Sequence, residues 1–175
     1  MKNLTALIIL AICSAMFAAN ASPKQNYKQA EKLQKSEKNK EAFEYYLKAA
    51  KQGDAEAQYL LGGCYLDDGD GVKKDHAEAV IWCRKAADQG LAEAQCSLGF
   101  CYYYGVGVEK DYKQAVMWLH KAAVQGVAQA QYLLGGCYAK GDGVEKDYEK
   151  AIAWLRKAAD QGDALAQAVL EDLSK

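Results

Sequence analysis

The sequence is poor in proline, phenylalanine and histidine, with one, three and two of these residues in 175. The single proline leaves helices free to run without interruption, and the few phenylalanines argue against a conventional globular core. Alanine is abundant instead, which favours closely packed helices. Basic and acidic residues nearly balance, at 22 and 23, and the isoelectric point is near 6.1. A nucleic-acid-binding domain normally needs a basic surface, so we expect no nucleic-acid partner.

Catalytic and cofactor motifs are also missing. The acylation motif S-x-x-K needs a lysine three residues after its serine, and no serine of the chain after residue 21 has one. There is no C-x-x-C pair, Walker loop or G-x-S-x-G motif, and two histidines are too few for the clustered imidazoles of a metal hydrolase. We therefore expect a non-catalytic protein without a metal site or cofactor.

Residues 1–21 have the features of a cleaved export signal. Lys2 supplies positive charge, 4–12 form an apolar run, and the small-x-small sequence A-N-A ends at Ala21. We expect cleavage after Ala21, a mature chain that starts at Ser22, and a periplasmic or secreted location. The apolar run is too short for a comfortable membrane span and no other segment could cross a bilayer, so we expect no stable membrane insertion.

A unit of 36 residues repeats along the mature chain. Tryptophan and aspartate recur at this interval, and a period of this length is typical of solenoid proteins. The recurring residues are Trp82, Trp118 and Trp154, together with Asp75, Asp111 and Asp147. We predict three full repeats at 54–90, 91–126 and 127–162, of which the first has one extra residue in its loop.

Each repeat has the pattern of two antiparallel helices joined by a glycine-containing turn. In the first helix, apolar residues recur at i, i+4, i+7 and i+8, which is the spacing of one helix face. Asp75 precedes the second helix, and Glu78 three residues later predicts a capping box. Gly90 follows the second helix in the position that favours a helix end.

The two ends of the chain depart from the repeat. Residues 22–53 predict a degenerate first repeat, whose start from Ser22 to Tyr27 we expect to be disordered. Residues 163–175 predict a lone capping helix that covers the apolar face of the helix before it. The expected fold is all-α, a solenoid of antiparallel helix pairs with three full repeats.

The repeats resemble a known family. The pattern A-x-A-x-x-x-L-G-x-x-Y, followed by G-x-G-V-x-x-D and A-x-x-W-x-x-K-A-A-x-x-G, is similar to the Sel-one-like repeat (SLR), a relative of the tetratricopeptide repeat. The resemblance implies a right-handed superhelix that serves as a non-catalytic scaffold for a protein or peptide partner. Some cysteine-rich bacterial members of the family have been associated with binding or hydrolysing β-lactams, so this function is the alternative.

By analogy with tetratricopeptide repeats, one face of each first helix forms the concave surface of the solenoid. The equivalent positions are Glu56, Tyr59, Gly63 and Leu66, then Glu93, Cys96, Phe100 and Tyr103, then Gln129, Tyr132, Gly136 and Ala139. The predicted partner-binding residues are Glu56, Tyr59, Glu93, Phe100, Tyr103 and Tyr132. Phe100 is a large ring between glycines of the neighbouring repeats, so it is a candidate anchor for a partner's side chain. The alternative for Phe100 is that it fills space in the core.

Five cysteines remain after the export signal, which is an odd number. Three of them share one position in successive repeats, where equivalent helices lie beyond the reach of a disulfide, so we expect small buried side chains there. These three are Cys64, Cys101 and Cys137. Cys83 and Cys96 lie at similar distances from the turn at Gly90, and two alternatives stay open for them, a disulfide or two buried thiols.

Charge is unevenly distributed along the mature chain. Residues 22–51 hold eight lysines against four glutamates, whereas residues 52–175 hold thirteen basic against nineteen acidic residues. A terminal helix kept soluble by its lysines accounts for the basic segment. The alternative is functional, in which the acidic solenoid favours a basic partner.

Overall fold

A computed structural model describes residues 21–66, 68 and 72–173 of the chain. The predicted export signal up to residue 20 lies outside this range, as do the loop residues Asp67, Gly69, Asp70 and Gly71. Within the described residues the chain forms nine helices and no strand. The helices are α2 (Pro23–Gln34), α3 (Asn39–Lys51), α4 (Ala55–Cys64), α5 (His76–Asp88), α6 (Ala92–Tyr104), α7 (Tyr112–Val124), α8 (Ala128–Lys140), α9 (Tyr148–Asp160) and α10 (Ala164–Leu173).

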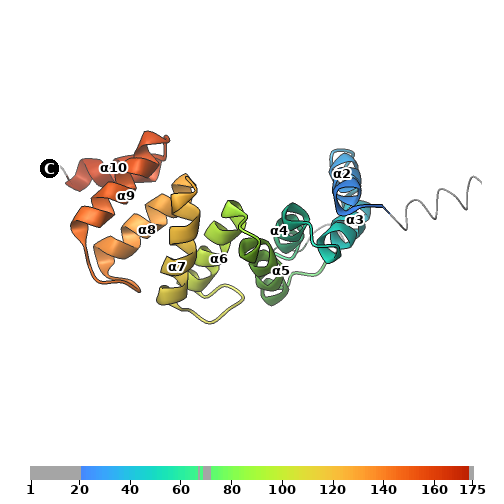
Figure 1. The fold of residues 1–175 in the computed structure, drawn as a ribbon, viewed down its shortest axis with the longest axis horizontal. Helices are drawn as coiled ribbons and strands as arrows, with labels where there is room; N and C mark the ends of the chain where they lie inside the picture. The colour runs from blue at the N-terminus through green and yellow to red at the C-terminus, as the bar shows by residue number, and fades with distance from the viewer. Residues whose placement is uncertain (1–20, 67, 69–71, 174–175) are drawn as a thin grey trace, which may run out of the picture.

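The helices form a solenoid, which confirms the predicted fold class. Each helix packs on the one before it and the one after it, and the most extensive contacts join α2 to α3, α4 to α5, α6 to α7 and α8 to α9. Figure 1 shows these pairs following one another along the long axis of the molecule. Both ends rise on the same side, so the row of helices is bowed.

The start of the described chain is ordered, so the predicted disorder from Ser22 to Tyr27 is wrong. Ser22 caps α2: its hydroxyl accepts a hydrogen bond from the Gln25 backbone N–H, and its own N–H donates to Gln25 Oε1. This reciprocal pair is a capping box, and Pro23 occupies the helix position that best tolerates proline. Asn26 is buried and donates from Nδ2 to Gln52 Oε1 over 2.9 Å, which ties α2 to the end of α3.

The aspartate caps of the second helices are present, but the capping box predicted at Asp75 and Glu78 is not. Asp75 Oδ1 accepts from the backbone N–H groups of Ala77 and Glu78. The N–H of Asp75, which the box would satisfy, instead donates to the Tyr65 carbonyl over 2.9 Å. The Glu78 carboxylate is thereby released to accept from Trp82 Nε1 over 2.8 Å.

The two helices of a pair pack very closely because small residues line their contact. A Cβ added at Gly99 of α6 would lie 2.7 Å from Leu119 Cγ of α7. Gly135 of α8 has the same relation to Leu155 of α9, where the distance would be 2.8 Å. Since real Cβ contacts are longer than this, only glycine fits at these positions.

A ladder of buried glutamines joins each repeat to the next. Gln95 of α6 donates from Nε2 to the Ala87 carbonyl of α5, and its Oε1 accepts from Gln125 Nε2 at the end of α7. Gln58 and Gln131 make the corresponding pairs of hydrogen bonds in the other two repeats. Each of these three amides is 5% exposed and bonds through both its amide nitrogen and its oxygen, so the ladder fixes how successive repeats stack.

Candidate functional site

The predicted partner-binding residues lie on α4, α6 and α8, where they line a series of hollows. We call the surface that contains these hollows the first-helix face. Four hollows of about 190 to 240 Å³ lie along it, and all twelve positions named above from the repeat analogy line at least one of them. Counted from the end nearest α2, the first two hollows share Tyr59 and Leu60, and the second and third share Leu66, Ser97 and Cys101. The fourth shares no lining residue with the other three.

The tyrosine–glutamate hollow lies at the end of the face nearest α2 and has a volume of about 210 Å³. Its lining residues are Tyr27, Glu56, Tyr59, Leu60, Leu91 and Glu93. Burial raises the pKa of Tyr27, and the carboxylates of Glu31, Glu56 and Asp54 raise it further. Two carboxylates and two tyrosine rings therefore lie in the wall of the same hollow.

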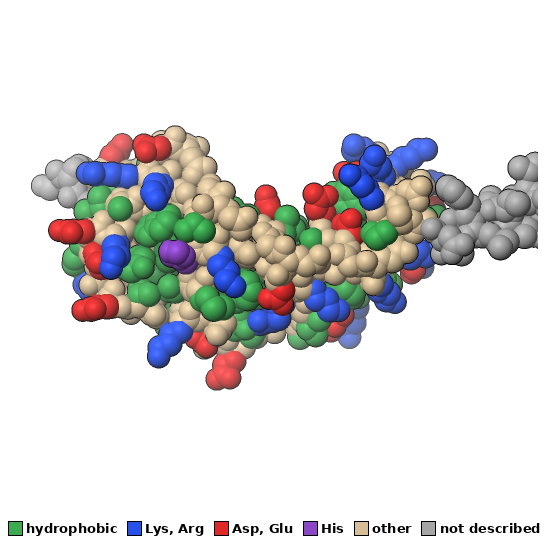
Figure 2. All heavy atoms as spheres, viewed as in Figure 1, with side chains coloured by type: hydrophobic (Ala, Val, Ile, Leu, Met, Phe, Trp, Pro, Cys, Tyr) green, Lys and Arg blue, Asp and Glu red, His purple; other side chains and the backbone are tan. Residues whose placement is uncertain are grey.

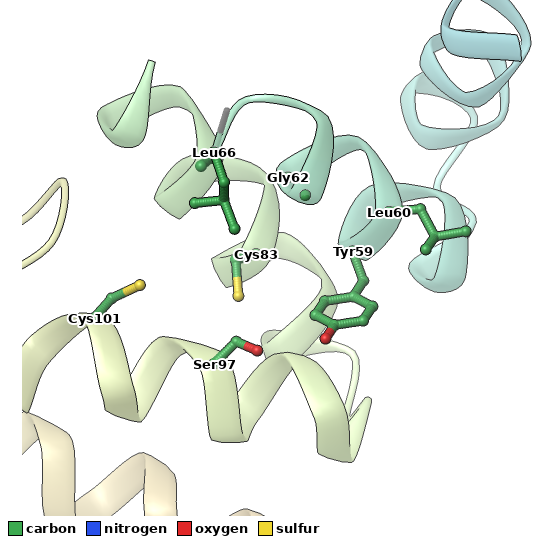
Figure 3. Close-up of a pocket in the computed structure, with 9 residues that line it drawn as sticks. Tyr59, Leu60, Gly62, Leu66, Cys83, Ser97 and Cys101 are labelled. Atoms are coloured by element: carbon green, nitrogen blue, oxygen red, sulfur yellow. The ribbon is translucent and has the colours of Figure 1, made fainter. Parts of the chain in front are cut away.

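The cysteine hollow, of about 190 Å³, lies between α4, α5 and α6. Figure 3 shows the sulfur atoms of Cys83 and Cys101 pointing into it from α5 and α6, with Leu66 and Tyr59 on the α4 side. Burial raises the pKa of the Cys83 thiol to about 12, and this thiol donates to the Ala94 carbonyl over 3.2 Å. Cys83 is therefore protonated at neutral pH and is a poor nucleophile.

The phenylalanine hollow, of about 240 Å³, lies between α6 and α8, with Cys96, Phe100 and Gln129 in its wall. The ring of Phe100 lies 4.4 Å from that of Tyr104, centroid to centroid, and the two side chains are 38% and 52% exposed. Phe100 is thus a surface residue in this structure. Tyr104 extends the same exposed aromatic patch, although the repeat analogy did not select it. The run of three tyrosines that ends at Tyr104 is the sequence feature that could have indicated it.

The tyrosine–lysine hollow, of about 230 Å³, lies between α6, α8 and α10, and Tyr103, Tyr132, Gly136 and Lys140 are in its wall. The Tyr103 hydroxyl donates to Asp142 Oδ2 over 2.7 Å and accepts from Lys140 Nζ over 3.3 Å. Burial and the hydrogen bond to this carboxylate both raise the pKa of Tyr103. These bonds hold the Tyr103 ring in one orientation at the edge of the hollow.

Cys83 and Cys96 are separate thiols in the structure. They pack in different core clusters, Cys83 with Cys101 and Trp118, and Cys96 with Leu119. Burial also raises the pKa of Cys96, to about 11. The disulfide between Cys83 and Cys96 stays a prediction. Of the three cysteines at the shared repeat position, Cys101 and Cys137 are buried, whereas Cys64 is partly exposed.

Within the part of the chain that the structure describes, no group of three or more His, Cys, Asp or Glu side chains is arranged to hold a metal ion. No helix in the described ranges has the length and apolar character needed to cross a membrane. Ser97 lies in the walls of two hollows, and within the described residues its hydroxyl makes no hydrogen bond to a lysine or histidine. The side chains that line the hollows of the first-helix face are mostly aromatic and apolar, with two carboxylates at the end nearest α2.

The sequence matches the Sel1 repeat four times, at residues 35–54, 55–91, 92–127 and 128–163. Among solved structures, the chain is similar to a protective antigen of uropathogenic Escherichia coli that displays an SLR fold, with 36% identity and a TM-score of 0.81 over 87% of this chain and 33% of that one. It is equally similar to a Sel1 repeat protein from Oxalobacter formigenes, with 36% identity and a TM-score of 0.81 over 89% of this chain and 46% of the other.

The chain thus spans a third to a half of the length of these two proteins. Cysteine rich protein B of Helicobacter pylori shares the fold at 23% identity, with a TM-score of 0.57 over 75% of this chain and 93% of that one. A comparison with curated proteins found no match.

Proposed function

The chain belongs to the Sel1 repeat family, and from this premise we propose that it is an exported, non-catalytic scaffold that binds a partner protein or peptide on the concave face of its solenoid. Proteins built from Sel1 repeats are generally interaction scaffolds. The first-helix face is the surface that we assign to the partner. Export to the periplasm or beyond rests on the features of residues 1–21.

One observation carries the assignment of the binding face. The residues selected from the repeat pattern, with no knowledge of their surroundings, come together around hollows large enough to accept side chains. Phe100 and Tyr104, both on α6, are exposed on this face. Exposed aromatic rings beside a hollow are typical of the anchor positions of protein interfaces.

The binding face is tested by comparing two alanine variants in partner capture. The mature protein, immobilised, is incubated with envelope extract, and the captured proteins are identified by mass spectrometry. Phe100→Ala should lose the partner that the wild type retains, while circular dichroism shows unchanged helix content. The matched control is Tyr148→Ala, which removes a ring that is 55% exposed on α9, a second helix. Equal retention by both variants would contradict the assignment.

The alternative function, β-lactam binding or hydrolysis, has less support. Hydrolysis by a serine enzyme needs a base within hydrogen-bonding reach of the nucleophile. Ser97 has no such partner within the described residues, and the thiols of Cys83 and Cys96 are held in the protonated form by burial. A nitrocefin assay separates the two proposals, because turnover that is abolished by one point substitution would favour the hydrolase.

A further inference from the structure

Two cysteine side chains share the cysteine hollow. Figure 3 shows the sulfur atoms of Cys83 on α5 and Cys101 on α6 pointing into this space. Both side chains are buried, and both belong to the same core cluster. The hollow has a volume of about 190 Å³, so there is room for an ion beside the two sulfur atoms.

Cys83 is the unusual member of this pair. It lies two residues before the K-A-A sequence of its second helix, and the residues at the same place in the other second helices are Tyr46, Leu119 and Leu155. The packing of a repeat therefore does not require a cysteine at this position. The thiol of Cys83 is specific to one repeat.

The position of Cys83 is the one that faces the shared cysteine position of the next first helix. One repeat further along, Leu119 of α7 packs with Cys137 of α8 in one core cluster. One repeat earlier, burial is the main cause that raises the pKa of Tyr46 to about 12, and Cys64 is among the smaller causes, so these two side chains are also close. The stacking of repeats thus brings the two positions together at both of these junctions.

At the junction of α5 with α6, the same arrangement brings two thiols together. Burial is the main cause that raises the pKa of Cys83, and Cys101 is the next largest, whereas Cys96 has the smallest effect. Cys96 also packs in a different core cluster. Of the two cysteines on α6, Cys101 is therefore the one that faces Cys83.

The chemistry of the wall selects the kind of ion. Among the described residues, those that line the hollow include no carboxylate and no imidazole. Zn²⁺ takes at least three protein ligands, and Ca²⁺ and Mg²⁺ take oxygen ligands, so none of these ions fits two sulfur atoms. Thiolate sulfur selects soft ions such as Cu(I), which two thiolates satisfy in a linear arrangement.

We propose that the cysteine hollow is a site for one Cu(I) ion, bound between the sulfur atoms of Cys83 and Cys101. Each thiol gives its proton to water as its sulfur bonds to the ion, so two S–Cu bonds form, two protons are released and no electron is transferred. The charge of Arg84 lowers the pKa of Cys83 and so favours its thiolate. This site goes beyond the proposed function, and neither proposal depends on the other.

Copper competition tests the site. The reduced mature protein is titrated without oxygen against Cu(I) held by bicinchoninate, and the fall in absorbance of the chelator complex measures the copper that the protein takes up. The wild type should take up one ion per chain. Cys83→Leu introduces the residue that α7 and α9 have at this position, so the helices should pack as before. This variant and Cys101→Ala should bind Cu(I) at least about a hundredfold more weakly, since loss of a supporting contact alone costs metal sites about 10- to 100-fold.

Two matched variants control for the loss of a buried thiol. Cys137→Ala removes the cysteine that faces Leu119 in the next repeat, and Cys96→Ala removes the other cysteine of α6. Both should bind Cu(I) like the wild type, and circular dichroism should show the same helix content in all four variants. X-ray absorption of the copper-loaded wild type should show two sulfur neighbours, and calorimetry in buffers of different protonation enthalpy should show the release of two protons.

Several results would overturn the proposal: no uptake of Cu(I) from bicinchoninate, wild-type affinity in Cys83→Leu, an equal loss in Cys96→Ala or Cys137→Ala, or nitrogen or oxygen neighbours around the bound copper. A disulfide between Cys83 and Cys101 in the native protein would also overturn it, because the ion needs both thiols. Partner capture is measured without copper, so none of these results decides the proposed function.

Discussion

At the scale of single residues, two kinds of residue determine the packing of the solenoid: the glycines between paired helices and the glutamines between repeats. The glycines stand in the repeat pattern, as the L-G of each first helix. The glutamine ladder was not recognised in the sequence, because a single glutamine in a helix has no spacing that distinguishes a buried amide from an exposed one. The signal that was available is its recurrence, as A-x-A-Q in each first helix and as Q-G after each second helix.

Gln131→Leu should destabilise the protein by about 1–3 kcal/mol, because the Ala123 carbonyl and the Gln161 amide lose their buried partner. Gln129→Leu, two residues earlier on α8 and exposed, should stay within about 0.5 kcal/mol of the wild type. Urea denaturation of both variants gives the two free energies of unfolding. Equal values for the two variants would remove the ladder as a source of stability.

Gly135→Ala and Gly136→Ala should have opposite effects. A Cβ at Gly135 would lie 2.8 Å from Leu155 Cγ and 3.1 Å from the Ala151 carbonyl oxygen, so α8 and α9 must separate, at a cost of about 1–3 kcal/mol. A Cβ at Gly136 has nothing within 4 Å, and alanine should stabilise the helix by up to about 1 kcal/mol. Thermal unfolding of the two variants checks the sign of each change, and a fall in melting temperature for Gly136→Ala would contradict the packing described here.

The thiol of Cys83 should be nearly inert to alkylation in the folded protein at pH 8. Its pKa is raised from 9.0 to about 12, so the reactive thiolate becomes abundant only as the pH approaches the raised value. The same shift makes Cys83 contribute stability below pH 9 that is lost as the pH rises toward 12, because the unfolded chain gives up this proton first.

The protein is alkylated without reductant, once in native buffer and once in urea. Its intact mass then gives the number of alkylated cysteines in the folded and in the unfolded chain. Five alkylated cysteines in urea, with Cys83 unmodified in native buffer, are expected for thiols. Two fewer in urea would instead establish a disulfide, and peptide mapping would show whether it joins Cys83 to Cys96.

At the scale of helices, the sequence predicted the three central pairs well because each repeat carries its own caps and turns. It failed at α2, where the capping box of Ser22 and Gln25 was overlooked in favour of the general tendency of chain ends to fray. The sequence also predicted a capping box at Asp75, which is wrong, because the capping-box pattern considers only residues three positions apart. The Tyr65 carbonyl that takes the Asp75 N–H lies in the preceding helix end, which no local rule includes.

Asp111→Ala should lower the free energy of unfolding by about 1 kcal/mol. Asp111 Oδ1 accepts from the backbone N–H groups of Lys113 and Gln114 at the start of α7, and alanine leaves both without this acceptor. Glu109→Ala removes an exposed carboxylate from the same loop without removing a cap and serves as the control. Chemical denaturation measures both, and an equal loss in the two variants would show that loop charge rather than capping is responsible.

At the scale of the whole molecule, the repeat period determined the architecture and also identified the face on which the hollows lie. The residues that line the face share positions in the repeat, so their gathering follows from the stacking alone. What the period could not give is the depth of the hollows or the exposure of Phe100, because these depend on how far apart neighbouring first helices lie. Figure 2 shows charged and apolar side chains mixed over the visible surface.

The central claim is that the partner occupies the first-helix face, and hydrogen–deuterium exchange of the protein with and without its captured partner tests it most directly. The account predicts slower exchange in α4, α6 and α8 on binding, with α5, α7 and α9 unchanged. Protection confined to the second helices would contradict it.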